Sequence, residues 1–426
     1  MTELYDRGQI QIENLLANAR RQADARGFER FPIIDVDSHH YEDRRWDEII
    51  PYIEDDGIRD WANAMIQRSG KAAATTITTA QVGNQEVSGR ILRAGRNQLS
   101  GQSDLSAADR MHDDVRRMLW AMDMMSIDQT IMFPTPMLHL SLHPAPEVEV
   151  ALARAYSKWL TQELLPQNDR IKTLVYLPFN DPAASLRMVE EFADVPGVVG
   201  FMVTSIRYRP VHANEYAPVY AALEKRGLPL AFHAAYNWHE QAMTQLNKFI
   251  SAHALGFSFC NIIHMTNMIV NGIPERFPGL KLLWVESGLA WIPFLMQRLD
   301  NEYLMRTSEC PLLTKRPSEY MREMYYSTQP MERTAPDAMM RASFDMINAE
   351  KTLLYSSDYP HWDFDVPSVL HDLPFLSEDV KRRILGGNAC DLFGLSTEKR
   401  APVSAAAAGL DGPMRGDAVA SASLMS

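Results

Sequence analysis

With 426 residues, 46% of them hydrophobic, the chain can bury one large core and is longer than a single small domain requires. Its formal net charge of −12 and the lack of any Lys/Arg run argue against a nucleic-acid partner. Its three scattered cysteines, its N-terminus without an apolar segment and the lack of an apolar stretch of about 18 residues predict a cytoplasmic protein with neither a signal peptide nor a membrane partner.

The first predicted element is a helix over residues 3–26, where apolar residues recur at helical spacing and Gly27 follows as the C-terminal cap. Because this helix precedes the first strand, we expect residues 1–29 to form a helical arm outside the main domain. We expect the arm to clasp either that domain or a neighbouring subunit.

The first strand contains an apolar run, Ile33, Ile34 and Val36, which is interrupted at every second position by the ionisable residues Asp35, Asp37 and His39. Side chains in a strand point alternately to its two faces, so the three ionisable residues share one face. A strand that lines a barrel and ends at a metal ion fits this pattern, with Asp37 and His39 as ligands. An ordinary edge strand with a polar exit is the alternative.

After a long insertion at residues 41–107, which in this position is expected to be a lid, strands and helices alternate along the chain. The later strands are short, apolar and bounded by Gly or Pro, as strands of a parallel sheet are, and are predicted at 127–134, 171–179, 197–205, 228–233, 280–286, 324–329 and 352–358. The helices are predicted at 107–125, 148–165, from Asp181 onward, 215–226, 252–272, 291–304, 337–346 and after Pro367.

Eight strands, each followed by a helix, predict an α/β fold of the (β/α)8 TIM-barrel type over residues 30–396. A doubly wound open sheet is the second choice, but no Gly-x-Gly-x-x-Gly follows an early strand. Residues 397–426 are rich in Ala, Ser and Gly and are predicted to form a disordered tail.

Ionisable residues stand at the carboxyl ends of four predicted strands, where a barrel carries its chemistry. They are Asp37 and His39, His233, Glu286, and Asp358. Two imidazoles with carboxylates suit a divalent ion, and this set favours Zn²⁺ over Mn²⁺. Asp358 is placed to bind the metal or to hold a proton, and Glu286 is a ligand, a base or a partner that orients His233.

At these residues the chain resembles the amidohydrolase superfamily, in the amidohydrolase-related (amidohydrolase 2) branch that includes the aminocarboxymuconate semialdehyde, γ-resorcylate and carboxyvanillate decarboxylases. The segments that carry the resemblance are Ile34-Asp-Val-Asp-Ser-His39, Leu230-Ala-Phe-His233, Ile273-Pro-Glu-Arg-Phe-Pro-Gly-Leu-Lys-Leu282 leading into Glu286-Ser-Gly288, and Tyr355-Ser-Ser-Asp-Tyr-Pro360. Together they extend over most of residues 30–396.

The resemblance implies one divalent metal ion bound by Asp37, His39, His233 and Asp358, with His233, Glu286 and Asp358 as catalytic residues. Glu286 departs from the family, which carries a histidine at that position and uses it to move protons. No lysine ends the fourth strand, so a second metal ion is not expected. The candidates for substrate binding are Arg207, Tyr236, His253, Gln329 and His361.

The function implied is that of a metal-dependent enzyme acting on a small cyclic or aromatic carboxylate, first of all by non-oxidative decarboxylation. A hydrolase of an amide or lactone, using metal-bound hydroxide, is the alternative, because the same fold carries out both reactions. A non-catalytic binding barrel with a degraded site is the third hypothesis. The arm and the insertion, in this family, lead us to expect a homodimer or homotetramer.

Overall fold

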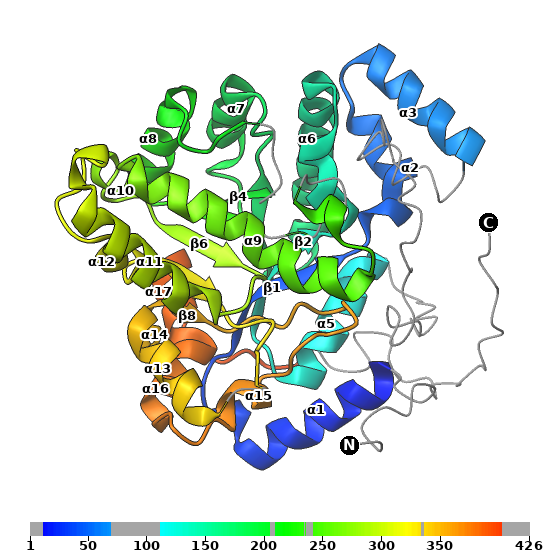
Figure 1. The fold of residues 1–426 in the computed structure, drawn as a ribbon. Helices are drawn as coiled ribbons and strands as arrows, with labels where there is room; N and C mark the ends of the chain where they lie inside the picture. The colour runs from blue at the N-terminus through cyan, green and yellow to red at the C-terminus, as the bar shows by residue number, and fades with distance from the viewer. Residues whose placement is uncertain are drawn as a thin grey trace.

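Eight parallel strands form one sheet in the order β1 to β8 (Figure 1). The computed structural model describes residues 12–69, 111–204, 209–233, 235, 242–333 and 336–402. The strands are β1 (Ile34–His40), β2 (Gln129–Pro134), β3 (Ile171–Tyr176), β4 (Val198–Thr204), β5 (Leu230–His233), β6 (Leu282–Val285), β7 (Tyr325–Ser327) and β8 (Leu353–Leu354).

The sheet closes on itself between β1 and the segment that follows β8. Val36 N donates a hydrogen bond to Tyr355 O at 3.0 Å, and Asp358 N donates one to Asp37 O at 2.7 Å. These bonds join the last strand to the first, so the architecture is a nearly closed barrel, as a (β/α)8 fold requires. The predicted fold is confirmed, and the open doubly wound sheet is excluded.

The last strand is shorter than the predicted 352–358 because two backbone N–H groups beyond Leu354 donate hydrogen bonds to side chains rather than to the backbone of a neighbouring strand. Ser356 N donates to Thr328 Oγ1 at 3.0 Å, and Ser357 N donates to Asp35 Oδ1 at 2.8 Å. Hydrophobic patterning identifies the buried apolar run, but it does not show where hydrogen bonds to side chains replace the hydrogen bonds between strands.

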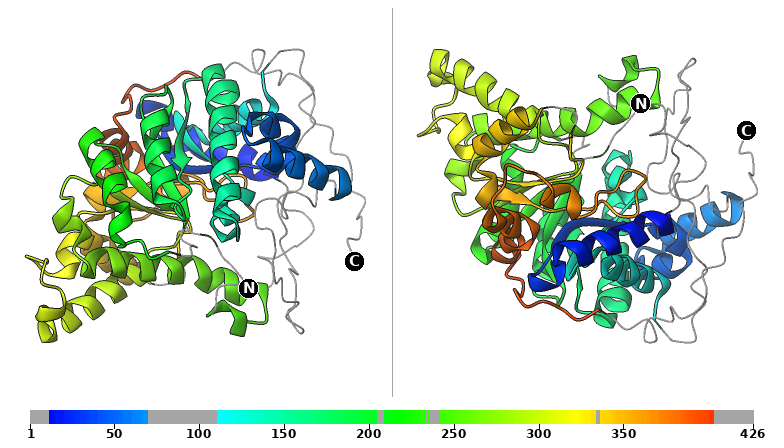
Figure 2. Two further views of the ribbon diagram at one scale, coloured as in Figure 1. Left: turned by 90° about the horizontal axis from the view of Figure 1, so that it is seen from above. Right: turned by 90° about the horizontal axis from the view of Figure 1, so that it is seen from below.

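Helices surround the strands on the outside of the barrel, as both views in Figure 2 show. The principal helices are α1 (Ile12–Arg26), α2 (Trp46–Ile49), α3 (Asp56–Ser69), α5 (Asp113–Met125), α6 (Pro146–Trp159), α7 (Pro182–Phe192), α8 (Ala217–Arg226), α9 (Phe249–Val270), α10 (Ile273–Arg276), α11 (Trp291–Met305), α12 (Pro317–Met321), α13 (Asp337–Ile347), α14 (Ala349–Thr352), α15 (Ser368–His371), α16 (Glu378–Arg382) and α17 (Asn388–Phe393). Among the described residues, no helix is long and apolar enough to cross a membrane.

The N-terminal arm packs on its own barrel. Helix α1 lies against α5 and α15 (Figure 1) and buries Leu16, Ala19 and Ala23. Arg26 forms a bidentate pair with the carboxylate of Asp372, with Nε 2.7 Å from Oδ1. The arm therefore clasps the domain itself over the described part, while the first nine residues of the predicted helix lie outside the described residues.

The insertion begins with ordered structure. Trp46 and Ile49 of α2 are buried, and α3 lies at the periphery of the barrel (Figures 1 and 2). Residues 70–110 lie outside the described residues, so the predicted lid stays a prediction. At the other end of the chain, Lys399 Nζ lies 2.7 Å from Asp128 Oδ2, so the first residues of the predicted tail contact the barrel.

Candidate metal centre

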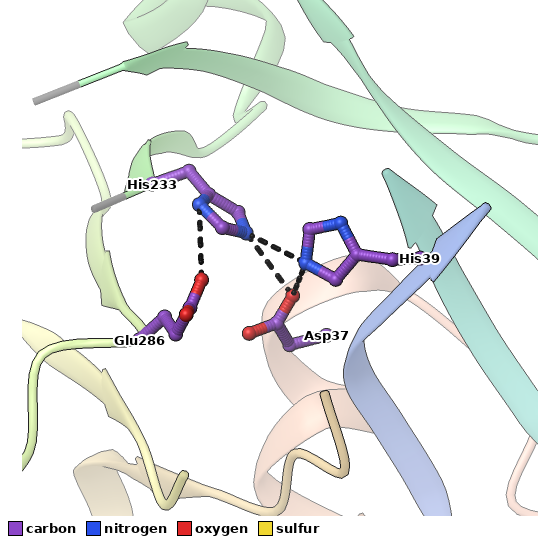
Figure 3. Close-up of side chains that lie close together, drawn as sticks. All are labelled: Asp37, His39, His233 and Glu286. Carbon is purple, nitrogen blue, oxygen red and sulfur yellow. Dashed lines mark hydrogen bonds and ion pairs between the residues drawn. The ribbon is translucent and has the colours of Figure 1, made fainter. Parts of the chain in front are cut away.

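Four ionisable side chains from β1, β5 and the end of β6 meet at the mouth of the barrel (Figure 3). His233 Nε2 lies 3.2 Å from both Asp37 Oδ1 and His39 Nε2. His39 Nε2 is itself 3.2 Å from Asp37 Oδ1, and His233 Nδ1 is 3.7 Å from Glu286 Oε2. All four side chains are buried. The parallel arrangement explains this convergence, because the carboxyl ends of all eight strands share one rim.

Asp358 and His361, from the loop after β8, complete the cluster. Asp358 Oδ1 lies 3.3 Å from His39 Nε2 and 2.6 Å from His361 Nδ1. The His361 ring stacks on the His39 ring with a centroid separation of 4.2 Å. Ligand atoms of His39, Glu286, Asp358 and His361 all lie within 4.8 Å of one another, as do those of the first four residues.

Two of the carboxylate residues adopt a backbone conformation that side-chain-bearing residues rarely adopt. Glu286 has φ 51° and Asp358 has φ 62°, both in the left-handed region. Such strain persists only where the surrounding structure enforces it, and it concentrates at functional sites. At these two strand ends it turns the carboxylates toward the cluster.

Neighbouring polar groups fix the orientation of the ligands. The His39 Nδ1 lies 3.0 Å from Pro134 O, which makes Nδ1 the donor and leaves Nε2 unprotonated toward the cluster. The Asp35 carboxylate accepts hydrogen bonds from Ser357 N and, at 2.5 Å, from Ser357 Oγ, which ties β1 to the segment carrying Asp358. Asp35 is thus a positioning residue outside the cluster.

The carboxylates of the cluster have opposed pKa shifts. Burial raises the pKa of Asp37, but the imidazoles of His233 and His39 outweigh burial and hold the pKa below its usual value. Burial and then the charge of Asp37 raise the pKa of Glu286 well above its usual value. Burial and the neighbouring carboxylates do the same to the pKa of Asp358. Negative charge is crowded here without a compensating Lys or Arg among the groups described.

A divalent cation fits this donor set. Three buried carboxylate oxygens, Asp37 Oδ2, Glu286 Oε2 and Asp358 Oδ2, have no hydrogen-bond partner. Leaving a buried polar atom unsatisfied costs about 1–3 kcal/mol, so native structures rarely contain three together. Imidazole and carboxylate are the ligands of Zn²⁺ and Mn²⁺ in proteins. Three of the four predicted metal ligands, Asp37, His39 and His233, lie in one group of donors, and the fourth, Asp358, lies in the second group, which shares His39 and Glu286 with the first.

A family model described as Amidohydrolase matches residues 113–395, which is more than half of the chain. The chain belongs to the amidohydrolase family. The expected resemblance is therefore confirmed. The β1 strand, with Asp37 and His39, precedes the matched residues, and its place in the site follows from the geometry described above.

Several relatives of this amidohydrolase are decarboxylases. The γ-resorcylate decarboxylase of Polaromonas sp. is 23% identical over 256 residues, which cover 57% of this chain and 76% of that protein. The 2-amino-3-carboxymuconate-6-semialdehyde decarboxylase of Dictyostelium discoideum is 20% identical over 258 residues, covering 60% and 69%. The solved 5-carboxyvanillate decarboxylase of Novosphingobium aromaticivorans, complexed with manganese and 4-hydroxy-3-methoxy-5-nitrobenzoic acid, superposes with a TM-score of 0.60 at 19% identity, covering 86% of this chain and 97% of that one. At 19% identity, the similarity to this solved structure shows the fold of the chain and nothing more.

The candidates for substrate binding lie at different distances from the cluster. His361 contacts it directly. Gln329 is buried, its Nε2 lies 3.4 Å from Asp363 O, and its Oε1 has no hydrogen-bond partner. His253 Nε2 lies 3.9 Å from Asp363 Oδ2, one step farther out. Arg207 and Tyr236 lie outside the described residues, so their roles stay predictions.

Sequence reasoning missed Asp363, whose charge raises the pKa of both Glu286 and Asp358. It follows Asp358 by five residues in the same loop, and a second carboxylate so close to a strand-end aspartate is the signal that could have identified it. His361 contacts the Asp358 carboxylate, and its predicted contact with a substrate stays a prediction.

Asp365, in the same loop, leads to a prediction about stability. Its Oδ2 accepts a hydrogen bond from Met331 N at 3.0 Å, and burial raises the pKa of its carboxyl to about 7. The folded protein keeps this proton at pH values where the unfolded chain releases it. Stability therefore falls as the pH rises from about 4 toward 7, and the loss is complete above that pH.

Asp365→Asn keeps the acceptor and removes the titration. Relative to the wild-type protein, the variant should gain on the order of 2 kcal/mol in free energy of unfolding between about pH 5 and about pH 7.5. Urea unfolding of both proteins at the two pH values measures this gain. A difference between the two proteins that does not change with pH would show that the carboxyl keeps its ordinary pKa.

Proposed function

We propose that this amidohydrolase is a metal-dependent decarboxylase of small aromatic carboxylates. The observation that carries the proposal is the buried cluster of imidazoles and carboxylates at the barrel mouth, where three carboxylate oxygens lack a partner. The decarboxylase names of the relatives favour this reaction over others of the family.

In this proposal Asp37, His39, His233 and Asp358 hold one divalent ion, either Zn²⁺ or Mn²⁺. When bound, the ion supplies positive charge that holds the substrate carboxylate and a neighbouring hydroxyl. His39 contributes through Nε2, because Pro134 O engages its Nδ1. The ligand side chains are buried, and burial strengthens each of these electrostatic contacts.

Glu286 is the proposed proton donor. Burial and the charge of Asp37 raise the pKa of this carboxyl well above its usual value, which favours its protonated form, and no hydrogen-bond partner holds Oε2. The bond between the ring carbon and the carboxylate breaks, its electron pair stays on the carbon, and CO₂ leaves. The Glu286 proton then adds to that carbon, so one proton replaces one carboxylate. Solvent returns the proton to Glu286.

The test offers the metal-loaded protein 2,6-dihydroxybenzoate and 5-carboxyvanillate in D₂O, with Zn²⁺ and Mn²⁺ loaded separately. We expect CO₂ release with one deuterium on the carbon that lost the carboxylate. Hydrolysis of aryl lactones or amides without CO₂ release would identify the hydrolase instead. Turnover of neither class by fully loaded protein would contradict both reactions and favour a binding barrel. The homodimer or homotetramer stays a prediction.

A further inference from the structure

A separate cavity of about 120 Å³ lies between the end of β1, the first turns of α5 and the Tyr359-Pro360 segment. It is distinct from the donor cluster, sharing only His39 with it. Its lining residues are His39, His40, Tyr41, Arg44, Arg45, Asp114, Arg117, Met118, Tyr359 and Pro360.

Positive charge dominates the lining of this cavity. Three arginines line it against a single carboxylate, that of Asp114. Arg45 Nη2 lies 3.0 Å from Asp114 Oδ1, and His40 Nδ1 lies 3.1 Å from Asp114 Oδ2, so the one negative group is fully engaged. Arg117 adds a further guanidinium charge to this lining, in a chain whose net charge is −12.

Among the three arginines of the lining, Arg117 is the one whose side chain lacks a described partner. Its side chain forms no hydrogen bond or ion pair with any residue that the structure describes, and its Nη1 is buried without an acceptor. Arg45 Nε is also buried without an acceptor. A partly buried guanidinium is normally paired, because desolvating its N–H groups without acceptors is costly.

Arg44 adds a third guanidinium, whose Cζ lies 5.1 Å from the centre of the Tyr41 ring. Stacking of this kind holds a guanidinium plane in place. A planar fork of N–H donors matches the oxygen pair of a carboxylate or a phosphate. The cavity, of about 120 Å³, is large enough for such a group.

We propose that this cavity is an anion-binding site that receives the carboxylate or phosphate group of a small anion, with Arg117 as its principal ligand-binding residue and Arg44 as the second. The site binds its anion whether or not the proposed decarboxylation takes place. Because His39 lines the cavity, the bound group lies directly beside the metal centre.

Calorimetric titration of the full-length protein with inorganic phosphate, and separately with benzoate, tests the site. Arg117→Gln should weaken binding about tenfold or more, since a charge-assisted pair is lost, and Arg44→Gln should weaken it by a smaller factor. Arg187→Gln, at an exposed position on α7, should bind as the wild-type protein does. Tighter binding of phosphate than of benzoate would identify a phosphate-bearing ligand, and the reverse a carboxylate.

The same variants distinguish anion binding in this cavity from anion binding at the metal centre, because Arg117 does not belong to the donor cluster. Anion affinity equal to wild type in both Arg117→Gln and Arg44→Gln would overturn the proposal, as would the absence of binding to the wild-type protein. Arg44 is exposed, so its replacement leaves the fold intact if Arg117→Gln proves unstable.

Discussion

His233→Ala is expected to abolish metal binding. His233 Nε2 lies 3.2 Å from donor atoms of both Asp37 and His39, at the centre of the cluster. Without it two buried acceptors face an empty space. Removing even a group that only orients a ligand lowers metal affinity about 10–100-fold, so loss of a ligand should lower it at least about 100-fold. Metal analysis after dialysis should find about one ion per wild-type chain and a trace in the variant.

The matched control is His371→Ala. His371 lies on α15, packs against Phe28 and takes no part in the donor cluster, so this variant should retain its metal. Decarboxylation should disappear with the metal in His233→Ala and persist in the control. A His233→Ala protein that is folded and holds the wild-type amount of metal would contradict the site as described.

Most of the donor cluster could be predicted from the sequence because of one property of parallel barrels. Asp37 and His39 lie at the end of β1, His233 ends β5 and Glu286 directly follows β6. Each residue lies at the end of an apolar run that hydrophobic patterning detects, and the fold brings all such ends to one rim. A residue at the end of a predicted strand is therefore predicted to lie at the mouth of the barrel.

The loop after β8 could not be predicted in the same way. The contact between His361 and Asp358 depends on the left-handed conformation of Asp358 and on bonds from the Ser357 backbone and hydroxyl to Asp35, more than 300 residues earlier in the chain. No periodicity encodes such bonds. The cavity beside Arg117 could not be predicted from the sequence either. It forms where α5 meets the end of β1, and a helical pattern predicts only that α5 exists.

Glu286, which stands where the family resemblance implies a histidine, gives the second large expected effect. Glu286→Gln preserves the shape of the side chain and removes its acidic proton. If Glu286 donates the proton to the ring carbon, kcat should fall about 10²–10⁴-fold, the usual contribution of a positioned general acid. Metal content should stay at the wild-type value, because Asp37, His39, His233 and Asp358 remain. Steady-state kinetics and metal analysis on the same preparation measure both quantities.

Glu286→His separates proton donation from metal binding. An imidazolium donates a proton near neutral pH, so this variant should recover part of the activity that Glu286→Gln loses. Glu147→Gln, at an exposed position on α6, is the control for the substitution itself and should match the wild-type protein. If Glu286→Gln instead loses its metal, Glu286 is a fifth ligand, and the proton must come from another acid of the cluster. Asp358, whose pKa is also raised by burial, is the residue then placed to supply it.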